Sequence, residues 1–397
     1  ESKKTFRELN TDFLLTVNKK VFDKVGFSFN AGGNIMKQYS QTLLSYATEL
    51  AVPNIYNLQN ANVPIVSSNI IYKKQINSLY YNGQFVFNNA LFFDFTGRND
   101  WSSTLSKGKN SYFYPSFNIS GVLTDLFDIQ TRTLSFAKLR AGWAQVGSDT
   151  DPYQLEPVYK FDQGWNASTK LATIYIPDNL ANSNLKPQRT NSLEIGADLR
   201  FFLNRIGIDF TYYNQKTYDQ IINLPITAAT GYVSKIVNAG EIQNSGIEIS
   251  LNVVPVKTRT GFEWNTTINY SLNRNVVNKL AEGLDKYVLG NYWSLDVIAK
   301  VGEPVGELYG YDFARNANGK IIYVDGLPYQ GQMRSLGNYT PDWVGSISNE
   351  FRYKNLSFSF LVDMRFGGEI YSMTTTWGRY AGVLKETLIG REGGIVG

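Results

Sequence analysis

The segment Gly147-Ser148-Asp149-Thr150-Asp151-Pro152 comes closest in this sequence to the residue types and spacing of a metal site. Carboxylates at positions i and i+2 are typical of calcium loops. The glycine and the distal glutamate of the EF-hand pattern are missing, and Asp and Ser commonly close hydrogen-bonded turns. We therefore expect a hydrogen-bonded turn after a strand, with a cation loop as the alternative, and we predict no metal site and no cofactor.

The residue types in the sequence give little support for a catalytic site. The 397-residue chain contains no His and no Cys, which removes the commonest general base, the commonest metal ligand and all thiol chemistry. The glycines between Gly302 and Gly310 are not followed by the Lys-Ser/Thr pair of a phosphate loop. The net charge of +4 forms no concentrated basic stripe, so no nucleic-acid partner is expected. We predict no catalytic residues and no enzymatic activity.

Aromatic side chains are the remaining candidates for ligand binding. Trp165, Tyr292, Trp293 and Trp377 lie in long links and could stack on sugar rings, and Tyr56 could add contact area to a partner-binding surface. The alternative is an aromatic girdle at a membrane interface or simple packing within the links.

The elements that position these residues are predicted to be β-strands. The evidence is that short segments of the chain alternate between apolar and polar side chains. In the segment 192–201, Leu193, Ile195 and Leu199 point one way while Glu194 and Asp198 point the other. Twelve segments behave in this way, some less regularly than others: 9–19, 27–37, 79–87, 91–98, 111–123, 138–145, 192–201, 206–215, 246–253, 262–273, 344–353 and 356–366.

The links between these segments alternate between short and long. Short links fall near 20–25, 88–89, 124–132, 202–205, 254–261 and 354–355, and long links near 39–73, 99–110, 148–187, 216–237 and 275–341. Tight turns at one end and long loops at the other are typical of outer-membrane barrels, whereas a sandwich has no reason to separate them. The pattern predicts an all-β fold, an antiparallel up-and-down transmembrane β-barrel with the apolar face toward lipid. We expect irregular backbone in the long links, three of which (39–73, 148–187 and 275–341) would form a partner-binding rim.

The polar faces carry charges of both signs, which a wet or plugged lumen tolerates and a second lipid face would not. The predicted lumen-facing charges are Asp94, Arg98, Lys138, Arg140, Glu194, Asp198, Arg200, Asp209, Glu248, Glu263, Asp363 and Arg365.

Five stretches resemble the SusC/RagA class of TonB-linked (TonB-dependent) outer-membrane transporters, in the order of that family. They are RNDWSSTLSKGKNSYFYPSFNIS (98–120), KLRAGWAQVGSDTDPYQL (138–155), LKPQRTNSLEIGAD (185–198), NAGEIQNSGIEISL (238–251) and GEPVGELYGYDF (302–313). The resemblance implies a 22-stranded barrel with an N-terminal plug domain, in the outer membrane of a Gram-negative bacterium. It also implies a SusD-like lipoprotein lid and import of oligosaccharides or peptides energised by TonB.

The chain departs from that family pattern at both ends. We identify no segment like a plug domain, a TonB-binding segment or a signal peptide, and the Gly-rich end, residues 391–397 (REGGIVG), does not resemble the expected terminal aromatic strand. We therefore expect residues 1–397 to be part of one barrel domain, the mid-to-late barrel, with the plug and the C-terminal strands absent from this chain.

Three other interpretations remain. One is a natural twelve-stranded pore, and another is a passive or structural barrel whose long extracellular loops bind a partner. The third is a twelve-stranded lipase-type barrel, which usually needs a Ser activated by a His that this chain lacks.

Overall fold

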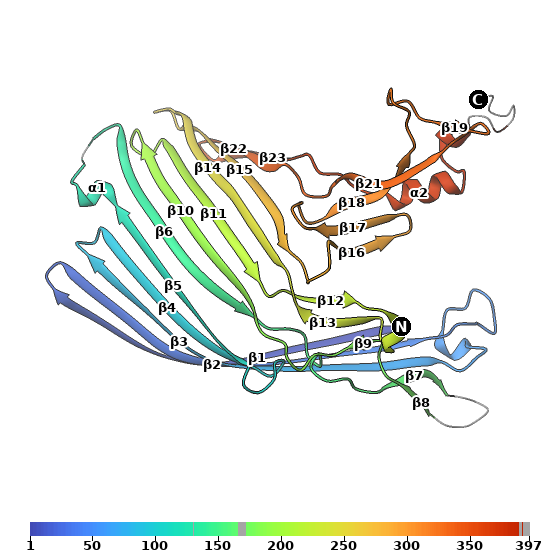
Figure 1. Ribbon diagram of the computed structural model, residues 1–397. Coiled ribbons are helices and arrows are strands. Elements are labelled where there is room, and N and C mark those ends of the chain that lie inside the picture. Colours follow the sequence, from blue (N-terminus) through green and yellow to red (C-terminus); the bar gives the residue numbers. More distant parts are fainter. Residues whose placement is uncertain (130, 166–171, 389–390, 392–397) are drawn as a thin grey trace. The chain divides into compact units, whose positions relative to one another are not determined.

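The computed structural model describes residues 1–129, 131–165, 172–388 and 391 (Figure 1). All twelve predicted strands are present. They follow one another in chain order in a single antiparallel sheet: β1 (Ser2–Phe22), β2 (Val25–Tyr46), β3 (Val66–Phe87), β4 (Leu91–Ser102), β5 (Ser111–Val122), β6 (Leu134–Ser148), β10 (Gln188–Phe201), β11 (Ile206–Tyr218), β14 (Glu241–Lys257), β15 (Phe262–Lys279), β22 (Trp343–Tyr353) and β23 (Leu356–Phe366).

The chain divides into two compact units. The first comprises Glu1–Leu199 and Tyr213–Glu241, and the second comprises Arg200–Tyr212 and Ile242–Gly397. In the first unit the short turns lie at one end of strands β1 to β5 and the longer links lie at the other end (Figure 1). In the second unit the β14–β15 and β22–β23 turns likewise lie opposite the long link between β15 and β22 (Figure 1).

Local sequence explains the tight turns. Asn88 and Asn89, which join β3 to β4, have φ values of 51° and 53°. Two successive residues at positive φ form the hairpin turn whose twist matches the flanking strands, and Asn tolerates that conformation. The β2–β3 pairing then runs without a register shift from Val25↔Phe87 to Tyr46↔Val66. An unbroken register keeps each face of the sheet chemically uniform along its whole length.

Aromatic rings form a ladder over the apolar face of the first unit. The ring of Phe85 lies 4.7 Å from Phe27 and 6.1 Å from Phe95. Phe95 lies directly over Gly83, where a Cβ atom would fall 2.2 Å from the ring. The ladder continues at Phe117, whose ring stacks on Trp143. An exposed aromatic face of this extent suits a lipid environment.

In the second unit the paired strands keep polar and apolar rows apart. Ile268 pairs with Ile347, which pairs with Val362, and this row lies on the apolar face. The next row, Asn269, Ser346 and Asp363, lies on the polar face.

One polar residue of β22 lies on the apolar face. Asn349 is buried there and accepts hydrogen bonds from Trp264 Nε1 at 2.9 Å and from Thr266 Oγ1 at 2.8 Å. These two donors satisfy the side-chain oxygen within the sheet, which explains the mixed sequence pattern of this strand.

The expectation of irregular backbone is wrong for three of the long links, those near 148–187, 216–237 and 275–341. Within the described residues, these three links form four small sheets, while the helix α1 (Leu123–Leu126) lies in the short β5–β6 link and α2 (Met373–Tyr380) lies after β23. Two of the sheets are two-stranded: β7 (Lys160–Trp165) with β8 (Ala172–Tyr175), and β19 (Tyr323–Val324) with β20 (Leu327–Pro328). A three-stranded sheet contains β9 (Asn179–Leu180), β12 (Ile221–Pro225) and β13 (Ser234–Asn238). A four-stranded sheet contains β16 (Lys286–Tyr292), β17 (Leu295–Lys300), β18 (Glu307–Phe313) and β21 (Gln330–Asn338).

These links also hold buried cores of their own. Leu105, Leu185 and Ile236 cluster in the first unit. In the second unit, Leu295 and Ile298 of β17 are buried in the four-stranded sheet. The strands here are only two to nine residues long, too short for alternation to distinguish them from loop, so the pattern did not predict them. No helix of the described residues is long and apolar enough to span a membrane.

Impermeant thiol labelling tests this topology within each unit. We expect cysteine at Tyr56 or Asn318, both in exposed long links, to label on intact cells. Cysteine at Asp23 or Arg259, both in exposed short turns, should label only after the outer membrane is opened. The substitutions belong in the complete protein with any other cysteine removed. Labelling of all four sites on intact cells would contradict the predicted sidedness.

Candidate functional site

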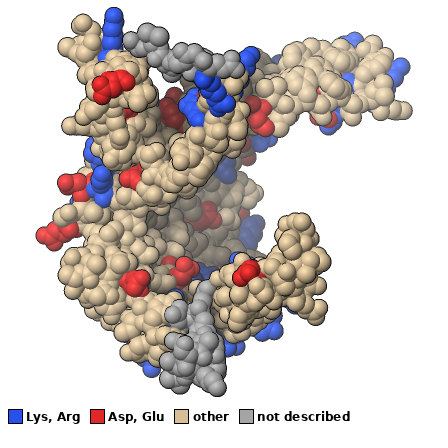
Figure 2. All heavy atoms as spheres, turned by 90° about the vertical axis from the view of Figure 1, so that its right-hand side faces the viewer, with Lys and Arg blue, Asp and Glu red and all other residues tan. Residues whose placement is uncertain are grey.

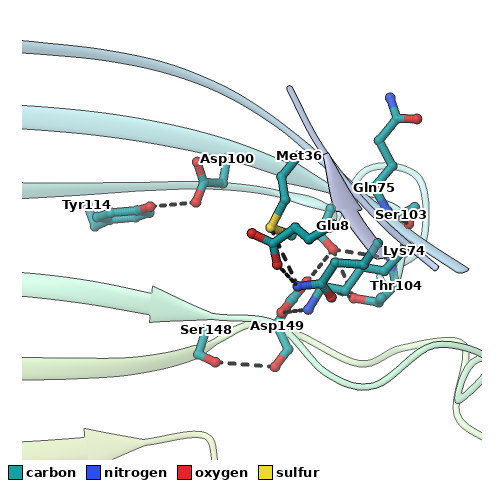
Figure 3. A network of polar contacts seen from close by, with 12 residues as sticks. Glu8, Met36, Lys74, Gln75, Asp100, Ser103, Thr104, Tyr114, Ser148 and Asp149 are labelled. Atoms are coloured by element: carbon teal, nitrogen blue, oxygen red, sulfur yellow. Dashed lines mark hydrogen bonds and ion pairs between the residues drawn. The ribbon is translucent and has the colours of Figure 1, made fainter. Parts of the chain in front are cut away.

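A polar network at the loop end of the first unit is centred on Asp149, which directly follows β6 (Figure 3). Its carboxylate accepts from Lys74 Nζ at 2.6 Å, from Thr104 Oγ1 at 3.1 Å and from the hydroxyl of Ser102. The Asp149 side chain is only 9% exposed and that of Lys74 19% exposed. A largely buried carboxylate with an ion pair and two hydroxyl donors is well satisfied, and it fixes the start of the long link to β3 and β4.

A second carboxylate, that of Asp100 on β4, forms hydrogen bonds with the neighbouring polar side chains. Asp100 is buried, and it accepts from Arg98 Nε at 2.8 Å and from the hydroxyl of Tyr114. Arg98 also donates to Ser78 Oγ at 2.7 Å, and its guanidinium lies 5.7 Å from the centre of the Tyr80 ring. Arg98 was among the predicted charges but Asp100 was not, although its position two residues further along the same face was an available signal.

The turn expected over 147–152 is displaced in the structure, because Gly147 and Ser148 continue β6, residues 149–151 are irregular and the turn lies at Pro152 and Tyr153. Asp149 is occupied by protein donors, while Asp151 lies in the lining of an adjacent pocket. Among the residues that the structure describes, no group of three or more acidic side chains could hold a metal ion.

That adjacent pocket has a volume of about 370 Å³ and a mixed polar and apolar lining that includes two aromatic residues. Its lining residues are Phe6, Gln38, Ser40, Tyr72, Lys74, Asp151, Pro152 and Gln154. Glu8 lies beside it and accepts from Gln38 Nε2 at 2.8 Å. The rings of Tyr72 and Tyr153 stack with centres 6.1 Å apart. Amide, hydroxyl and carboxylate groups beside an aromatic ring can bind a neutral polar ligand.

A larger groove of about 590 Å³ lies in the second unit. Four of the predicted lumen-facing charges line it: Asp209, Glu248, Asp363 and Arg365. Arg365 donates to the backbone carbonyl of Tyr339 at 2.8 Å. Three carboxylates against one guanidinium make this groove acidic.

The other predicted charges have local partners. Asp94 accepts from Gln84 at 2.7 Å, Lys138 lies 6.0 Å from the Phe92 ring, Glu194 accepts from Ser192 at 3.3 Å and Glu263 pairs with Lys257 at 2.8 Å. Arg140 lies against Gly196, where a Cβ atom would fall 2.6 Å from its Nε, and Asp198 and Arg200 have partners as well. That these twelve side chains face the lumen of the barrel stays a prediction.

Two of the predicted aromatic residues come together. The rings of Trp293 and Trp377 lie 4.0 Å apart, and Tyr380 lies 6.1 Å from Trp293 and 5.9 Å from Trp377. All three remain substantially exposed. Trp293 lies in the β16–β17 turn, and the other two are three residues apart on α2. Tyr380 was not among the predicted aromatic residues, although its helical spacing places it on the same face as Trp377.

The remaining three aromatic candidates do not join this cluster. Tyr292 ends β16 and is half exposed, and Tyr56 is 88% exposed. Trp165 ends β7, and its side chain lies outside the described part of the chain.

Charge is dispersed over the face that carries the long links. Lys and Arg side chains are interspersed there with Asp and Glu (Figure 2). Asp312 of β18 is one example, because it accepts from Arg334 at 2.9 and 2.6 Å and lies 3.6 Å from Arg315. The hydrogen bonds from Arg334 hold the pKa of this carboxyl below its usual range.

Comparison with known proteins gives the family. Residues 4–387 match the family described as "TonB dependent receptor-like, beta-barrel". The chain belongs to this family. Its relatives include TonB-dependent receptor P3 of Formosa agariphila, 26% identical over 93% of this chain and 40% of that protein. TonB-dependent receptor SusC of Bacteroides thetaiotaomicron is 28% identical over 71% of this chain and 30% of that protein.

Solved structures confirm the fold of the TonB-dependent receptor barrel. The chain matches the structure titled "Structure of the RagAB peptide transporter" with a TM-score of 0.75 and 18% identity, over 91% of this chain and 42% of that one. The predicted SusC/RagA resemblance and all-β barrel are therefore confirmed. The chain spans about 40% of the length of the first curated relative.

Family membership also confirms two further predictions, the localisation and the protein class. TonB-dependent receptors lie in the outer membrane of Gram-negative bacteria, as predicted for this chain. The family consists of receptors and transporters and not of enzymes, which confirms that prediction too.

Proposed function

We propose that the complete protein is an active importer of oligosaccharides or peptides, energised by TonB and working with a SusD-like surface lipoprotein. The observation that carries this proposal is the folded link between β15 and β22. It forms a four-stranded sheet with buried Leu295, Ile298 and Leu308. A barrel that only anchored itself would gain nothing from ordering this much chain outside the membrane.

The chemistry of both units is consistent with uptake of a polar solute. The first unit has the pocket beside Asp151, and the second has the acidic groove lined by Asp209, Glu248 and Asp363. The likeness to SusC and to the RagAB peptide transporter supports the choice of oligosaccharides or peptides and of a lipoprotein partner. Coupling to TonB would require a plug domain, which we place outside this chain.

Loop shortening in the complete protein tests the proposal. We expect replacement of residues 281–341 by a brief Gly/Ser linker to leave membrane insertion intact but to abolish both co-purification of the lipoprotein and substrate uptake. The matched control shortens 317–321, at the tip of the same link, and should leave both near normal. Unchanged binding and uptake after the large deletion would contradict the proposed rim.

A second candidate function is a passive or structural barrel whose extracellular loops bind a partner. The exposed cluster of Trp293, Trp377 and Tyr380 favours some binding role for these links, since Trp and Tyr are enriched in interface cores. Uptake that does not depend on TonB, together with retained partner binding, would favour this alternative.

A further inference from the structure

An apolar groove of about 460 Å³ lies on the outward, lipid-facing side of the first unit. Side chains of the apolar face that line it include Phe13, Leu15, Phe29, Leu79 and Phe113. Glycines help to shape it, because the Tyr81 ring lies over Gly97, where a Cβ atom would fall 2.5 Å from the ring. The groove therefore follows the sheet surface and offers almost only apolar groups to its occupant.

A basic pocket of about 490 Å³ adjoins this groove toward the loop end. Lys109, Lys186 and Arg189 line it, against a single acidic residue, Asp219. Arg189 pairs with Asp219 at 3.1 Å, so two lysines remain to give the pocket positive charge. Neither lysine forms an ion pair with any acidic residue that the structure describes.

The basic groups are held in place by the fold. Lys109 Nζ donates to Asn184 Oδ1 at 2.9 Å. The backbone of Lys186 is bound twice by Asn238, which accepts from its N–H at 2.8 Å and donates to its carbonyl at 2.8 Å. A cationic pocket held in this way loses less entropy when an anion binds.

The groove and the pocket are continuous with each other. Phe113 lines both and is 50% exposed. Asn99 of the groove donates to Ser111 of the pocket at 2.9 Å. Trp101, opposite Ser111 in the β4–β5 pairing, also lines the groove at this boundary. Trp is typical of the interface between the hydrocarbon and the polar headgroups of a membrane.

We propose that this combined surface binds one anionic lipid of the outer leaflet. An acyl chain would lie in the groove between Phe13 and Phe113, and a headgroup phosphate would contact Lys109, Lys186 and Arg189. We infer an anionic lipid because three features follow one another along the sheet: an apolar groove, an interfacial Trp, and then excess positive charge. Ammonium and guanidinium groups bind phosphate oxygens through charge-assisted hydrogen bonds.

Native mass spectrometry of the complete protein tests the charged part of this site. Dimyristoyl phosphatidylglycerol and dimyristoyl phosphatidylcholine, which share acyl chains, are titrated separately. We expect preferential retention of phosphatidylglycerol, and a roughly tenfold or larger loss of that preference in Lys109→Gln/Lys186→Gln, because each basic residue contributes to anionic-lipid attraction. The control Lys320→Gln/Lys385→Gln removes two exposed lysines elsewhere and should change nothing.

Variants in the groove test the acyl part. Ala31→Leu fills the groove and should weaken retention of both lipids, whereas Ala141→Leu, on the same face but outside the groove, should not. Leu79→Trp is a second groove variant if Ala31→Leu fails to insert, as judged by heat-modifiable gel migration. A preference that survives the lysine substitutions would overturn the proposal. So would equal competition by inorganic phosphate together with no effect of the groove variants, which would show an anion site without lipid specificity.

Discussion

Replacing Ile268 with Arg should destabilise the folded barrel by about 2–4 kcal/mol, the cost of an unpaired charge near the bilayer midplane. Ile268 lies on the apolar face, in one row with Ile347 and Val362. That row of described residues contains no carboxylate that could pair with a guanidinium. The measurement is the free energy of unfolding of the complete protein, by denaturant titration in lipid vesicles. Ile249→Arg, on the same face of β14, should show a similar loss.

The matched control is the neighbouring residue. Asn269 lies on the polar face and lines the acidic groove with Asp209, Glu248 and Asp363. An Arg at position 269 finds carboxylates and water there, so its cost should stay below about 1 kcal/mol, the size of an exposed electrostatic effect. Similar costs at 268 and 269 would show that the two faces are assigned incorrectly.

Asp149→Ala should release the start of the long link after β6. The substitution leaves Lys74 without its ion pair and removes the acceptor of Ser102 and Thr104. Breaking a fully buried pair by removing one partner costs about 3–5 kcal/mol. We expect roughly 2–3 kcal/mol, because Lys74 retains some contact with water. Hydrogen exchange should then show protection of the amides after Asp149 lowered by roughly 30- to 150-fold.

Two further variants make this result specific. Asp151→Ala removes a carboxylate two residues away that faces the adjacent pocket, and it should leave protection unchanged. In Lys74→Met/Asp149→Leu both charges are absent, so part of the lost protection should return. If the amides after Asp149 exchanged at the same rate in Asp149→Ala and Asp151→Ala, the network would have no role in holding the link.

The sequence by itself determined the large sheet, its two faces and its tight turns. Alternation is a local property, because neighbouring residues of a strand must point to opposite sides whatever lies further away. The Leu193–Leu199 alternation is one such case, and the Asn88-Asn89 turn is another, since the side chain itself tolerates positive φ.

Tertiary structure alone decided which residues meet in the long links. Lys74 and Asp149 are 75 positions apart, and Trp293 lies in the link between β15 and β22 whereas Trp377 lies after β23. No periodicity connects such pairs, because their contact depends on how strands of the large sheet bring distant links together. The short strands such as β17 and β18 were missed for a different reason, since six or seven residues show too little alternation to mark a strand. Each is stabilised by a partner strand and a buried core that its own few residues do not reveal.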